Sequence, residues 1–346
     1  MKQAGGGIIG NMAKIRLVHT YDYIISLENL LEAWREFVRG KRQRRDVQVF
    51  ALNLIDNINL LHTELVNQTY RHGGYKAFNI SDPKPRHIHK AAVRDRLLHH
   101  AIYRVLYPFF DRTFISDSFS CRNDKGTHRA LNRFRSFAFK VSRNHTRTCW
   151  VLKCDIKKFF ANIDHGILKS ILAEYIQDKN ILWLLGQVID SFSSGRVGVG
   201  LPLGNLTSQL LVNIYMNKFD QFVKYRLKAK YYIRYADDFV FLSADKNWSI
   251  DLLPSIESFL GEKLKLHLHP DKVFIKTLAA GVDFLGWIHF IDHRVLRTVT
   301  QRRMWQKLEG ASSSESVASY DGLLWHGNAG KLRKRLTLFL IDKKQD

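Results

Sequence analysis

Two adjacent carboxylates inside an apolar stretch constrain this chain more than any other feature. In the segment YYIRYADDFVFLS, Asp237 and Asp238 separate two runs of residues that are typical of β-strands. The pattern predicts a tight hairpin with the acids at its turn. Like charges at one turn repel each other, which costs stability unless a cation binds there. A solvent-exposed Asp-Asp turn is the alternative.

A third acid ends a second strand-like segment, WVLKCDIKKFF. Asp155 lies at the end of the strand predicted over Val151–Ile156. Carboxylates from this strand and from the hairpin can bind two Mg²⁺ ions roughly 3.5–4 Å apart, the spacing used in phosphoryl transfer. Because Mg²⁺ keeps water and substrate phosphates as ligands, three protein acids suffice.

The charge balance points to a polyanionic partner. The 346 residues include 54 Lys and Arg against 32 Asp and Glu, which gives a net charge of +22. With 45% hydrophobic residues a core can form, and the length suggests two or three subdomains. Nucleic acid is the leading partner and an anionic membrane the second, whereas an acidic small molecule would not require so much charge.

The sequence also predicts a cytoplasmic, soluble protein. Three irregularly spaced cysteines without a CxxC pair favour neither a disulfide framework nor a structural zinc site. The N-terminus lacks the apolar segment of a signal peptide. The longest uncharged stretch, residues 197–217, contains several glycines and Pro202, which argue against a membrane span.

Local patterns predict most of the secondary structure. Asp164 is typical of a helix N-cap. Helical periodicity is found over residues 27–38, 47–67, 93–106, 165–176 and 252–264, and again within the basic C-terminal segment. Besides the YADD segment, hairpins are predicted around ISDPKPRHIHK and around GVDFLGWIHF with the following RVLRTV.

This arrangement resembles the palm of reverse transcriptases. Asp155 and Phe160 match the first palm motif, YADD matches the third, and the resemblance extends from Ser26 to the C-terminus. It implies an α+β right-hand polymerase fold with helical and hairpin fingers, an antiparallel-sheet palm and a helical thumb. The implied boundaries are a flexible N-terminus at 1–20, fingers with an N-terminal helical extension at 21–145, a palm with insertions at 146–298 and the thumb at 299–346.

The resemblance assigns the catalytic centre. In this family the first palm Asp and the first Asp of YxDD bind the catalytic metals, which here are Asp155 and Asp237, with Asp238 as a supporting acid. Ile156 offers its backbone carbonyl to the second metal. Lys272 matches the palm lysine proposed to protonate pyrophosphate, although a surface lysine fits the sequence nearly as well. The expected cofactors are two Mg²⁺ ions, with Mn²⁺ as an in vitro substitute.

Other residues match the family's dNTP contacts. Phe160 occupies the position of a bulky residue under the sugar, where it would clash with a 2′-OH and select dNTPs; ordinary core packing is the alternative. Lys84 and Arg86 lie on the hairpin that the family folds over the triphosphate. Arg86 is the stronger candidate because a guanidinium grips phosphate with two hydrogen bonds. Gln209 completes this set.

The remaining assignments concern nucleic acid. Arg122 matches a fingers motif expected to contact the template, with a surface charge as the alternative, and Phe284-Leu285-Gly286 resembles the primer grip. Two basic clusters are expected on the nucleic-acid backbone, namely Arg42, Arg44 and Arg45 near the template and Lys331, Arg333 and Arg335 on the duplex.

The loop from Leu201 to Gln209 suggests which branch of the family this chain belongs to. Group II intron enzymes usually read QGxxxSP, whereas here Leu203 precedes Gly204 and the segment ends in SQ. GxxxSQ is the pattern of diversity-generating retroelements and of several defence-associated reverse transcriptases. An aliphatic Leu203 would remove a hydrogen-bonding contact from the nascent base-pair pocket and relax fidelity, unless it merely packs.

Two biological roles are therefore weighted equally: error-prone cDNA synthesis in a diversity-generating retroelement, and antiphage defence with a non-coding RNA. The expected partners are a structured RNA template, the RNA/DNA duplex, dNTPs and an accessory protein or second subunit, but no membrane. The sequence shows no maturase extension after the thumb and no retron VTG motif, so we expect neither of those enzymes.

Two other classes compete, a catalytically silent RNA-binding scaffold and an RNA-dependent RNA polymerase. The intact acids Asp155, Asp237 and Asp238 argue against the scaffold. Phe160, together with YADD in place of GDD, argues against the RNA polymerase.

Overall fold

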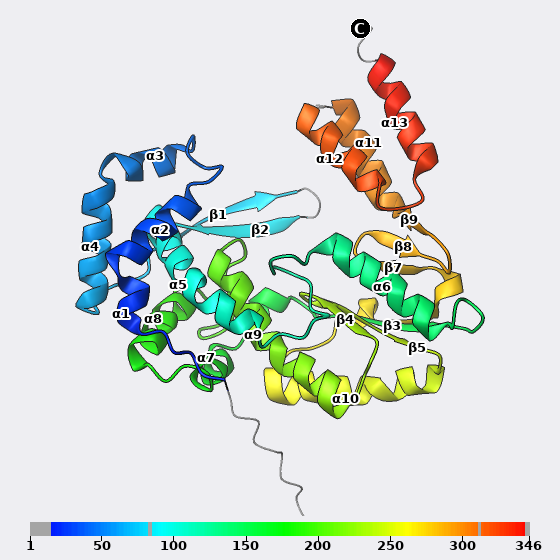
Figure 1. The fold of residues 1–346 in the computed structure, drawn as a ribbon, viewed down its shortest axis with the longest axis horizontal. Helices are drawn as coiled ribbons and strands as arrows, with labels where there is room; N and C mark the ends of the chain where they lie inside the picture. The colour runs from blue at the N-terminus through cyan, green and yellow to red at the C-terminus, as the bar shows by residue number, and fades with distance from the viewer. Residues whose placement is uncertain (1–14, 82–84, 311–312, 343–346) are drawn as a thin grey trace, which may run out of the picture. The chain divides into compact units, whose positions relative to one another are not determined.

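A computed structural model describes residues 15–81, 85–310 and 313–342 of the chain (Figure 1). Its contacts divide the chain into two compact units that interleave in sequence. Unit 1 comprises Met1–Ile80, Arg86–Thr113 and Phe160–Met216, and unit 2 comprises Ser81–Pro85, Phe114–Phe159 and Asn217–Asp346. The predicted fingers, palm and thumb boundaries stay a prediction.

Unit 1 is mainly helical. Its helices are α1 (Tyr21–Ile25), α2 (Leu27–Phe37), α3 (Arg45–Leu52), α4 (Leu54–Val66), α5 (Val93–Asp111), α7 (His165–Ala173) and α8 (Lys179–Asp190), and it contains most of α9 (Leu206–Gln221). The amphipathic α2 packs on α5 through buried residues that include Leu30 and Phe37. The Ser26 hydroxyl caps α2 by accepting a hydrogen bond from the Asn29 backbone.

Two local predictions in unit 1 need comment. The single helix predicted over 47–67 is wrong, because Asn53 leaves the helical region (φ −118°, ψ 45°) and separates α3 from α4. Of the predicted flexible N-terminus, residues 1–14 lie outside the described residues. Within the remainder, the Leu17 backbone N–H donates to the Tyr175 carbonyl at 3.0 Å.

Unit 1 also contains the predicted hairpin. Strands β1 (Tyr75–Ile80) and β2 (Arg86–Ala91) pair antiparallel, with Tyr75 opposite Ala91 and Ile80 opposite Arg86. The polar loop before α9 attaches to β2, since the His89 N–H donates to the Leu203 carbonyl at 3.0 Å.

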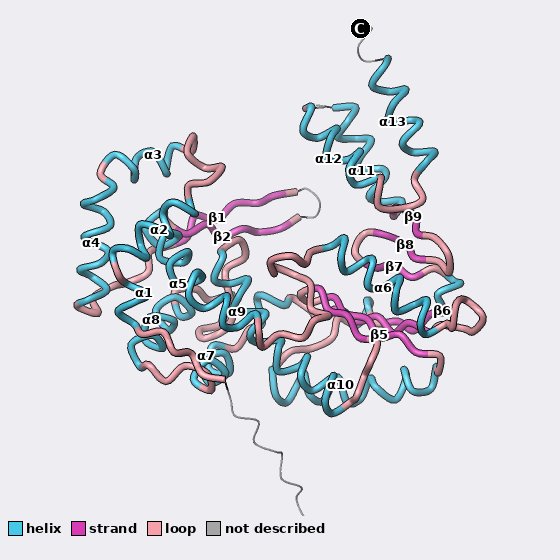
Figure 2. Tube along the Cα trace, in the orientation of Figure 1, coloured by secondary structure: helices cyan, strands magenta, loops and turns pink. Residues whose placement is uncertain are grey.

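Unit 2 is built on a four-stranded antiparallel sheet in the order β4-β5-β3-β6. The strands are β3 (Trp150–Asp155), β4 (Tyr232–Tyr235), β5 (Asp238–Ser243) and β6 (Phe274–Thr277). Helices α6 (Thr127–Val141) and α10 (Lys246–Leu264) cover opposite faces of this sheet (Figures 1 and 2). Both faces of the central strands are therefore buried, which explains their nearly continuous apolar sequences.

A second sheet and three helices complete unit 2. The predicted hairpin forms as β8 (Trp287–His289) and β9 (Arg294–Leu296), and β7 (Val282–Phe284) adds a third antiparallel strand. They are followed by α11 (Thr298–Gly310), α12 (Ser314–Leu324) and α13 (Gly330–Asp342). Short irregular helices occur in unit 2 at η2 (Phe222–Arg226), η3 (Pro270–Lys272) and η4 (Leu278–Ala280), and η1 (Phe159–Asn162) belongs mostly to unit 1.

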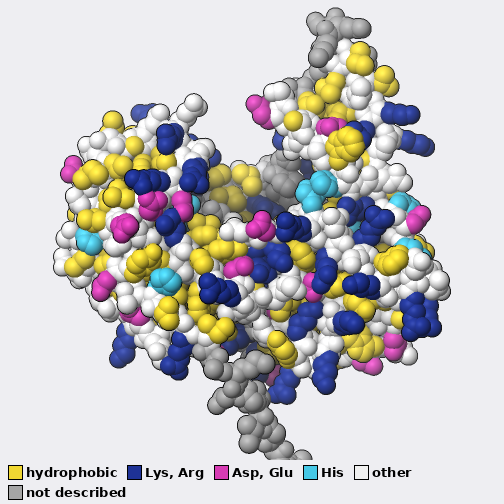
Figure 3. All heavy atoms as spheres, viewed as in Figure 1, with side chains coloured by type: hydrophobic (Ala, Val, Ile, Leu, Met, Phe, Trp, Pro, Cys, Tyr) yellow, Lys and Arg dark blue, Asp and Glu magenta, His cyan; other side chains and the backbone are white. Residues whose placement is uncertain are grey.

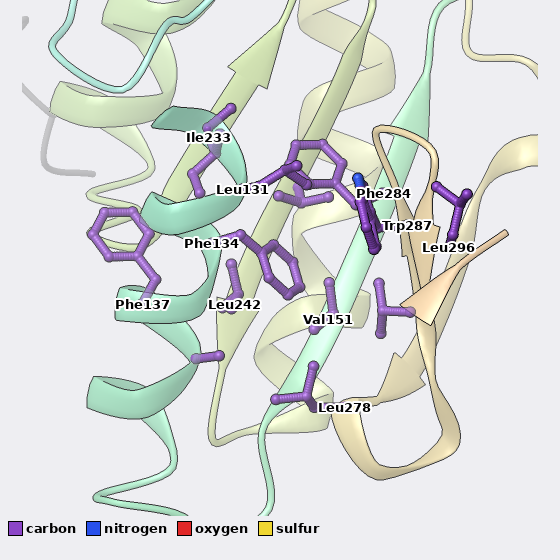
Figure 4. Packing of buried hydrophobic residues seen from close by; sticks show 14 of the residues in the cluster. Leu131, Phe134, Phe137, Val151, Ile233, Leu242, Leu278, Phe284, Trp287 and Leu296 are labelled. Atoms are coloured by element: carbon purple, nitrogen blue, oxygen red, sulfur yellow. The ribbon is translucent and has the colours of Figure 1, made fainter. Parts of the chain in front are cut away.

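One hydrophobic core joins these layers of unit 2. Phe134 of α6 stacks on Phe284 at 5.5 Å between ring centroids, and Trp287 and Leu242 belong to the same buried cluster (Figure 4). The cluster continues into the C-terminal helices through Met304 and further apolar residues. Because it includes Val151, Ile233 and Val240, this core holds β3, β4 and β5 together.

Candidate active site

Strand register brings the three predicted acids to one end of the unit 2 sheet. Asp155 is the last residue of β3 and pairs directly with Asp238, the first residue of β5. Asp237 lies in the turn between β4 and β5, and its carbonyl accepts a 3.1 Å hydrogen bond from the Ile156 N–H. The carboxylates that the sequence singled out are thus neighbours in space.

The turn itself is tight. Ala236 and Asp237 connect Tyr235 to its partner Asp238, and Ala236 adopts a left-handed conformation with φ of +56°. Such a conformation is costly for a residue with a Cβ, so neighbouring contacts must hold it. The Arg234 guanidinium provides one of them by donating from Nη1 to the Ala236 carbonyl at 3.2 Å.

Sequence reasoning missed the support of this turn. Arg234 and Asp220 are fully buried and form an ion pair of 2.6 Å between Nη2 and Oδ2. Arg234 Nη2 also donates to the Ser118 hydroxyl at 3.0 Å. One signal was available, because an arginine within the apolar run YYIRY requires a buried acidic partner.

Asp238 is the electrostatically strained member of the acid cluster. Burial, together with the nearby charges of Asp155 and Asp237, raises the pKa of its carboxyl to about 7, although Lys153 opposes the shift. Lys153 Nζ lies 3.4 Å from Asp238 Oδ2, whereas the buried Oδ1 has no hydrogen-bond partner. A buried oxygen without a donor is what a bound cation would satisfy.

Lys272 lies beside the same cluster, as predicted. Its Nζ is 3.0 Å from Asp155 Oδ1, and the side chain is 46% exposed. The neighbouring His269 N–H donates to the Asp155 carbonyl at 2.7 Å, which anchors the η3 turn to the end of β3. An ammonium group therefore lies beside the predicted catalytic carboxylates, and its role as a proton donor stays a prediction.

The oxygen atoms of the three acids are ligands that suit Mg²⁺, although the side chains do not lie close enough together to form a metal site. Within the described ranges, no group of three or more His, Cys, Asp or Glu side chains is close enough to hold a metal ion. The available ligands are hard oxygens, as Mg²⁺ prefers. The Ile156 N–H donates to the Asp237 carbonyl, so the Ile156 backbone lies beside the turn, and a metal contact by its own carbonyl stays a prediction.

Of the predicted dNTP-binding residues, Arg86, Phe160 and Gln209 belong to unit 1, whereas the three acids belong to unit 2. Arg86 is exposed at the start of β2, and Lys84 lies outside the described residues. Phe160 is partly exposed, unlike its buried neighbour Phe159. Gln209 is partly buried in the first turns of α9. These roles stay predictions.

The loop before α9 is shaped by backbone contacts with the hairpin. Leu203 is partly buried and its carbonyl is bound by β2. Gly204 has φ of +104°, and a Cβ there would lie 2.7 Å from Ile88 Cγ2. Glycine is therefore required by both backbone conformation and space.

Two motifs assigned to nucleic acid make internal contacts. Arg122 donates from Nη1 to the Ile115 and Ser118 carbonyls, at 2.7 and 3.0 Å, so it helps to hold the loop before α6. Phe284 is buried in the core, while the left-handed residues Leu285 and Gly286 form the β7–β8 turn. A template or primer contact by these residues stays a prediction.

The two basic clusters differ in the exposure and the contacts of their side chains. The residues of the α2–α3 cluster are exposed, namely Arg42, Arg44 and Arg45. On α13, Lys331 is exposed, but the Arg333 guanidinium lies 3.3 Å from the Trp325 ring centre and that of Arg335 lies 4.4 Å from the Trp305 ring centre. Lys and Arg side chains also gather over α6 on the face seen in Figure 3.

An antiparallel sheet between helices, with carboxylates at one strand end, defines the palm of a nucleic-acid polymerase. The chain belongs to the family described as reverse transcriptase (RNA-dependent DNA polymerase), which residues 81–289 match. The resemblance, the α+β polymerase fold and the nucleotidyltransferase class predicted from the sequence are thereby confirmed. This family generally uses divalent metal ions.

Three relatives illustrate the similarity. Protein YkfC of Escherichia coli (strain K12) is 26% identical over 289 residues, which cover 71% of this chain and 73% of YkfC. Group II intron-encoded protein LtrA of Lactococcus lactis subsp. cremoris is 23% identical over 280 residues, covering 60% of this chain and 44% of LtrA. A Candida albicans telomerase structure has a TM-score of 0.50 at 15% identity, covering 67% of this chain and 46% of that chain, and it is similar in fold alone.

The chain thus spans most of YkfC but less than half of LtrA and of that telomerase chain. Among the described residues, none of the helices is long and apolar enough to cross a membrane.

Proposed function

We propose that this chain is an active RNA-directed DNA polymerase that adds dNTPs to a primer 3′-OH on an RNA template, with two Mg²⁺ ions. The observation that carries the proposal is the register of β3 and β5, which pairs Asp155 with Asp238 beside the turn that bears Asp237. A scaffold that only binds RNA gains nothing from three carboxylates that repel each other and the nucleic-acid backbone.

In this proposal each residue has a separate task. Asp155, Asp237 and the Ile156 carbonyl hold the metal ions, and Asp238 supports them from the neighbouring strand. Bound Mg²⁺ would activate the primer hydroxyl and neutralise charge on the triphosphate. Lys272 donates a proton to the departing pyrophosphate, for which its place 3.0 Å from Asp155 is suitable.

Substrate choice and phosphate contacts are assigned to unit 1. The partly exposed Phe160 is available to exclude a ribose 2′-OH, and the exposed Arg86 is available to bind the triphosphate. The net charge of +22 supports binding of an RNA template and of the RNA/DNA duplex, as well as a structured partner RNA. The reducing cytoplasm of a bacterial cell is the proposed location.

For the biological role we propose error-prone cDNA synthesis in a diversity-generating retroelement. The support is Leu203, an aliphatic residue in the loop where group II intron enzymes usually carry glutamine, held by a backbone bond to β2. The GxxxSQ pattern of the same loop equally supports an antiphage reverse transcriptase that works with a non-coding RNA.

The polymerase proposal is tested by primer extension with the full chain, primed RNA, dNTPs and Mg²⁺, with and without the native RNA. We expect DNA product from the wild type and from Asp251→Asn, which removes an exposed acid on α10, but none from Asp237→Asn. Equal product from Asp237→Asn, or no product under either condition, would overturn the proposal.

The role is tested by sequencing the products. We expect Leu203→Gln to lower the error rate at template adenines, whereas the volume-conserving Leu203→Met leaves it unchanged. An error rate that is already low in the wild type, or that Leu203→Gln does not change, would contradict the diversity-generating role and favour defence.

A further inference from the structure

Unit 2 contains a cavity of about 480 Å³ that the palm carboxylates do not line. Its walls come from α6, from β8 and β9 with their connecting loop, and from the loop between α12 and α13. Pockets of 300–1,000 Å³ are typical of small-molecule sites. The residues used below are Asn132, Arg135, His289, Phe290, Arg294 and Trp325.

Two residues that line this cavity, His289 and Arg294, each have a buried polar atom without a hydrogen-bond partner. His289 and Arg294 pair directly across β8 and β9, so both side chains lie on the same face of the sheet. His289 is 3% exposed, and its Nε2 has no hydrogen-bond partner, as is also true of the buried Arg294 Nη1. Since buried polar atoms are normally satisfied, this pair points to a ligand.

The arginine is held in place by its other nitrogens. Arg294 Nε donates to the His326 carbonyl, and Nη2 donates to Asn132 Oδ1 at 3.2 Å. Both bonds fix the guanidinium plane, so the remaining Nη1 is a preorganised donor.

The histidine supplies an acceptor. Burial, reinforced by Arg294, lowers the pKa of His289 to about 3, so the ring is neutral at physiological pH. The Phe284 backbone carbonyl bonds to this ring, which assigns the ring proton to Nδ1 and leaves Nε2 as an acceptor.

Aromatic side chains and a cation line the rest of the cavity. Trp325 is 64% exposed, yet its orientation is fixed because Nε1 donates to Asp321 Oδ2 at 3.2 Å and Arg333 packs on the ring. Phe290 offers a second ring, and the exposed Arg135 lies at the cavity. Rings beside a cation are the elements with which proteins stack bases and bind phosphates.

We propose that this cavity is a second nucleotide site, which binds a keto base, guanine or uracil. Arg294 Nη1 donates to the base carbonyl, and the adjacent ring N–H donates to His289 Nε2. Adenine lacks the carbonyl and cytosine lacks an N–H beside it, so both leave one buried group unpaired. Trp325 stacks on the base and Arg135 binds the phosphate, whether the nucleotide is free or part of an RNA chain.

The test is calorimetry of the full chain with GMP, UMP, AMP and CMP in EDTA, which prevents metal-dependent binding at the palm acids. GMP and UMP are expected to bind at least about tenfold more tightly than AMP and CMP. Asp237→Asn is expected to bind like the wild type, so the result does not depend on polymerase activity. Equal affinities for all four nucleotides would overturn the proposal.

Two variants test the walls of the site. Trp325→Ala is expected to weaken GMP binding roughly tenfold. Tyr225→Ala, which removes a ring that is 67% exposed and outside the cavity, is the matched control and should have no effect. His289→Phe keeps an aromatic ring in the core and is expected to abolish the keto preference, while a thermal melt verifies folding. An unchanged preference in folded His289→Phe refutes the assignment.

A second titration distinguishes the sources. Single-stranded oligoadenylate is compared with the same RNA carrying one central guanosine or uridine. If the RNA with a guanosine or uridine binds more tightly than free GMP, RNA is the ligand. If free GMP binds more tightly than that RNA, a free nucleotide is the ligand. No keto preference in either form refutes the site.

Discussion

The buried pair Arg234–Asp220 makes a prediction in which stability and activity separate. Both side chains are fully buried, and Arg234 Nε donates to Asp220 Oδ1 at 2.8 Å. Replacing Arg234 with methionine leaves a carboxylate buried without its cation. The removal of one partner from such a pair costs about 3–5 kcal/mol, so unfolding of unit 2 should move to clearly lower urea concentration.

The double variant Arg234→Met, Asp220→Leu removes both charges. Apolar replacement of a whole buried pair is often neutral or stabilising, so most of the lost stability should return. The recovery is incomplete, because the Tyr232 hydroxyl donates to Asp220 Oδ1 at 2.8 Å and would lose that partner. A buried polar group without a hydrogen-bond partner lowers the free energy of unfolding by about 1–3 kcal/mol.

Activity should not return with stability. In both variants the 3.2 Å hydrogen bond from Arg234 Nη1 to the Ala236 carbonyl is lost, and this bond holds the turn that carries Asp237. One hydrogen bond contributes about 0.5–1.5 kcal/mol, so the rate of primer extension should fall up to about tenfold in the single and the double variant alike.

The assays are urea unfolding followed by tryptophan fluorescence, and primer extension well below the melting temperature. Full recovery of the extension rate in the stable double variant would refute a positioning role for Arg234. A loss below about 1 kcal/mol in Arg234→Met would refute the stability argument, because a fully buried unpaired carboxylate cannot cost so little.

Three further predictions follow from other residues. Phe160→Ala should raise incorporation of ribonucleotides relative to dNTPs, and unchanged selectivity in primer extension would show that this side chain only packs. Gly204→Ala should destabilise unit 1 by about 1–3 kcal/mol, because the new Cβ would lie 2.7 Å from Ile88 Cγ2. The control Gly186→Ala in α8 has open space around its Cβ and should be neutral or stabilising by up to about 1 kcal/mol. Equal urea midpoints for the two variants would contradict this prediction. The pKa of His289 is lowered from 6.5 to about 3 in the folded chain, so the unfolded chain takes up a proton first as the pH decreases. The free energy of unfolding should therefore decrease by up to about 1.4 kcal/mol for each pH unit below about 6.5. His289→Phe should flatten this dependence, and parallel slopes for both proteins in melts from pH 7 to 5 would reject this cause.

Local features were predictable from the sequence. The Asp164 cap forms as expected, since it involves only residues within one helical turn. The YADD hairpin and the strand that ends at Asp155 follow from alternation and turn chemistry over a few residues. The family itself was readable from these short motifs.

Other features depend on contacts between distant segments. The break at Asn53 was not predicted, because both flanking stretches are helical by pattern. The predicted pairing of β9 with β8 is confirmed, but the division of the preceding segment into β7 and β8 at the Leu285–Gly286 turn was not predicted, since the core around Phe284 and Trp287 decides it. Neither outcome could be read from propensity.

The sequence by itself determined the chemistry of this protein: three acids in palm motifs, an excess of basic charge and enough apolar residues for a core. Only the tertiary structure decided which side chains share a buried environment. It places Arg234 against Asp220, leaves Asp238 Oδ1 unpaired and sets His289 beside Arg294. The physical reason is that hydrogen bonds and pKa shifts depend on distance and burial, and residues far apart in sequence acquire both only when strands and helices pack.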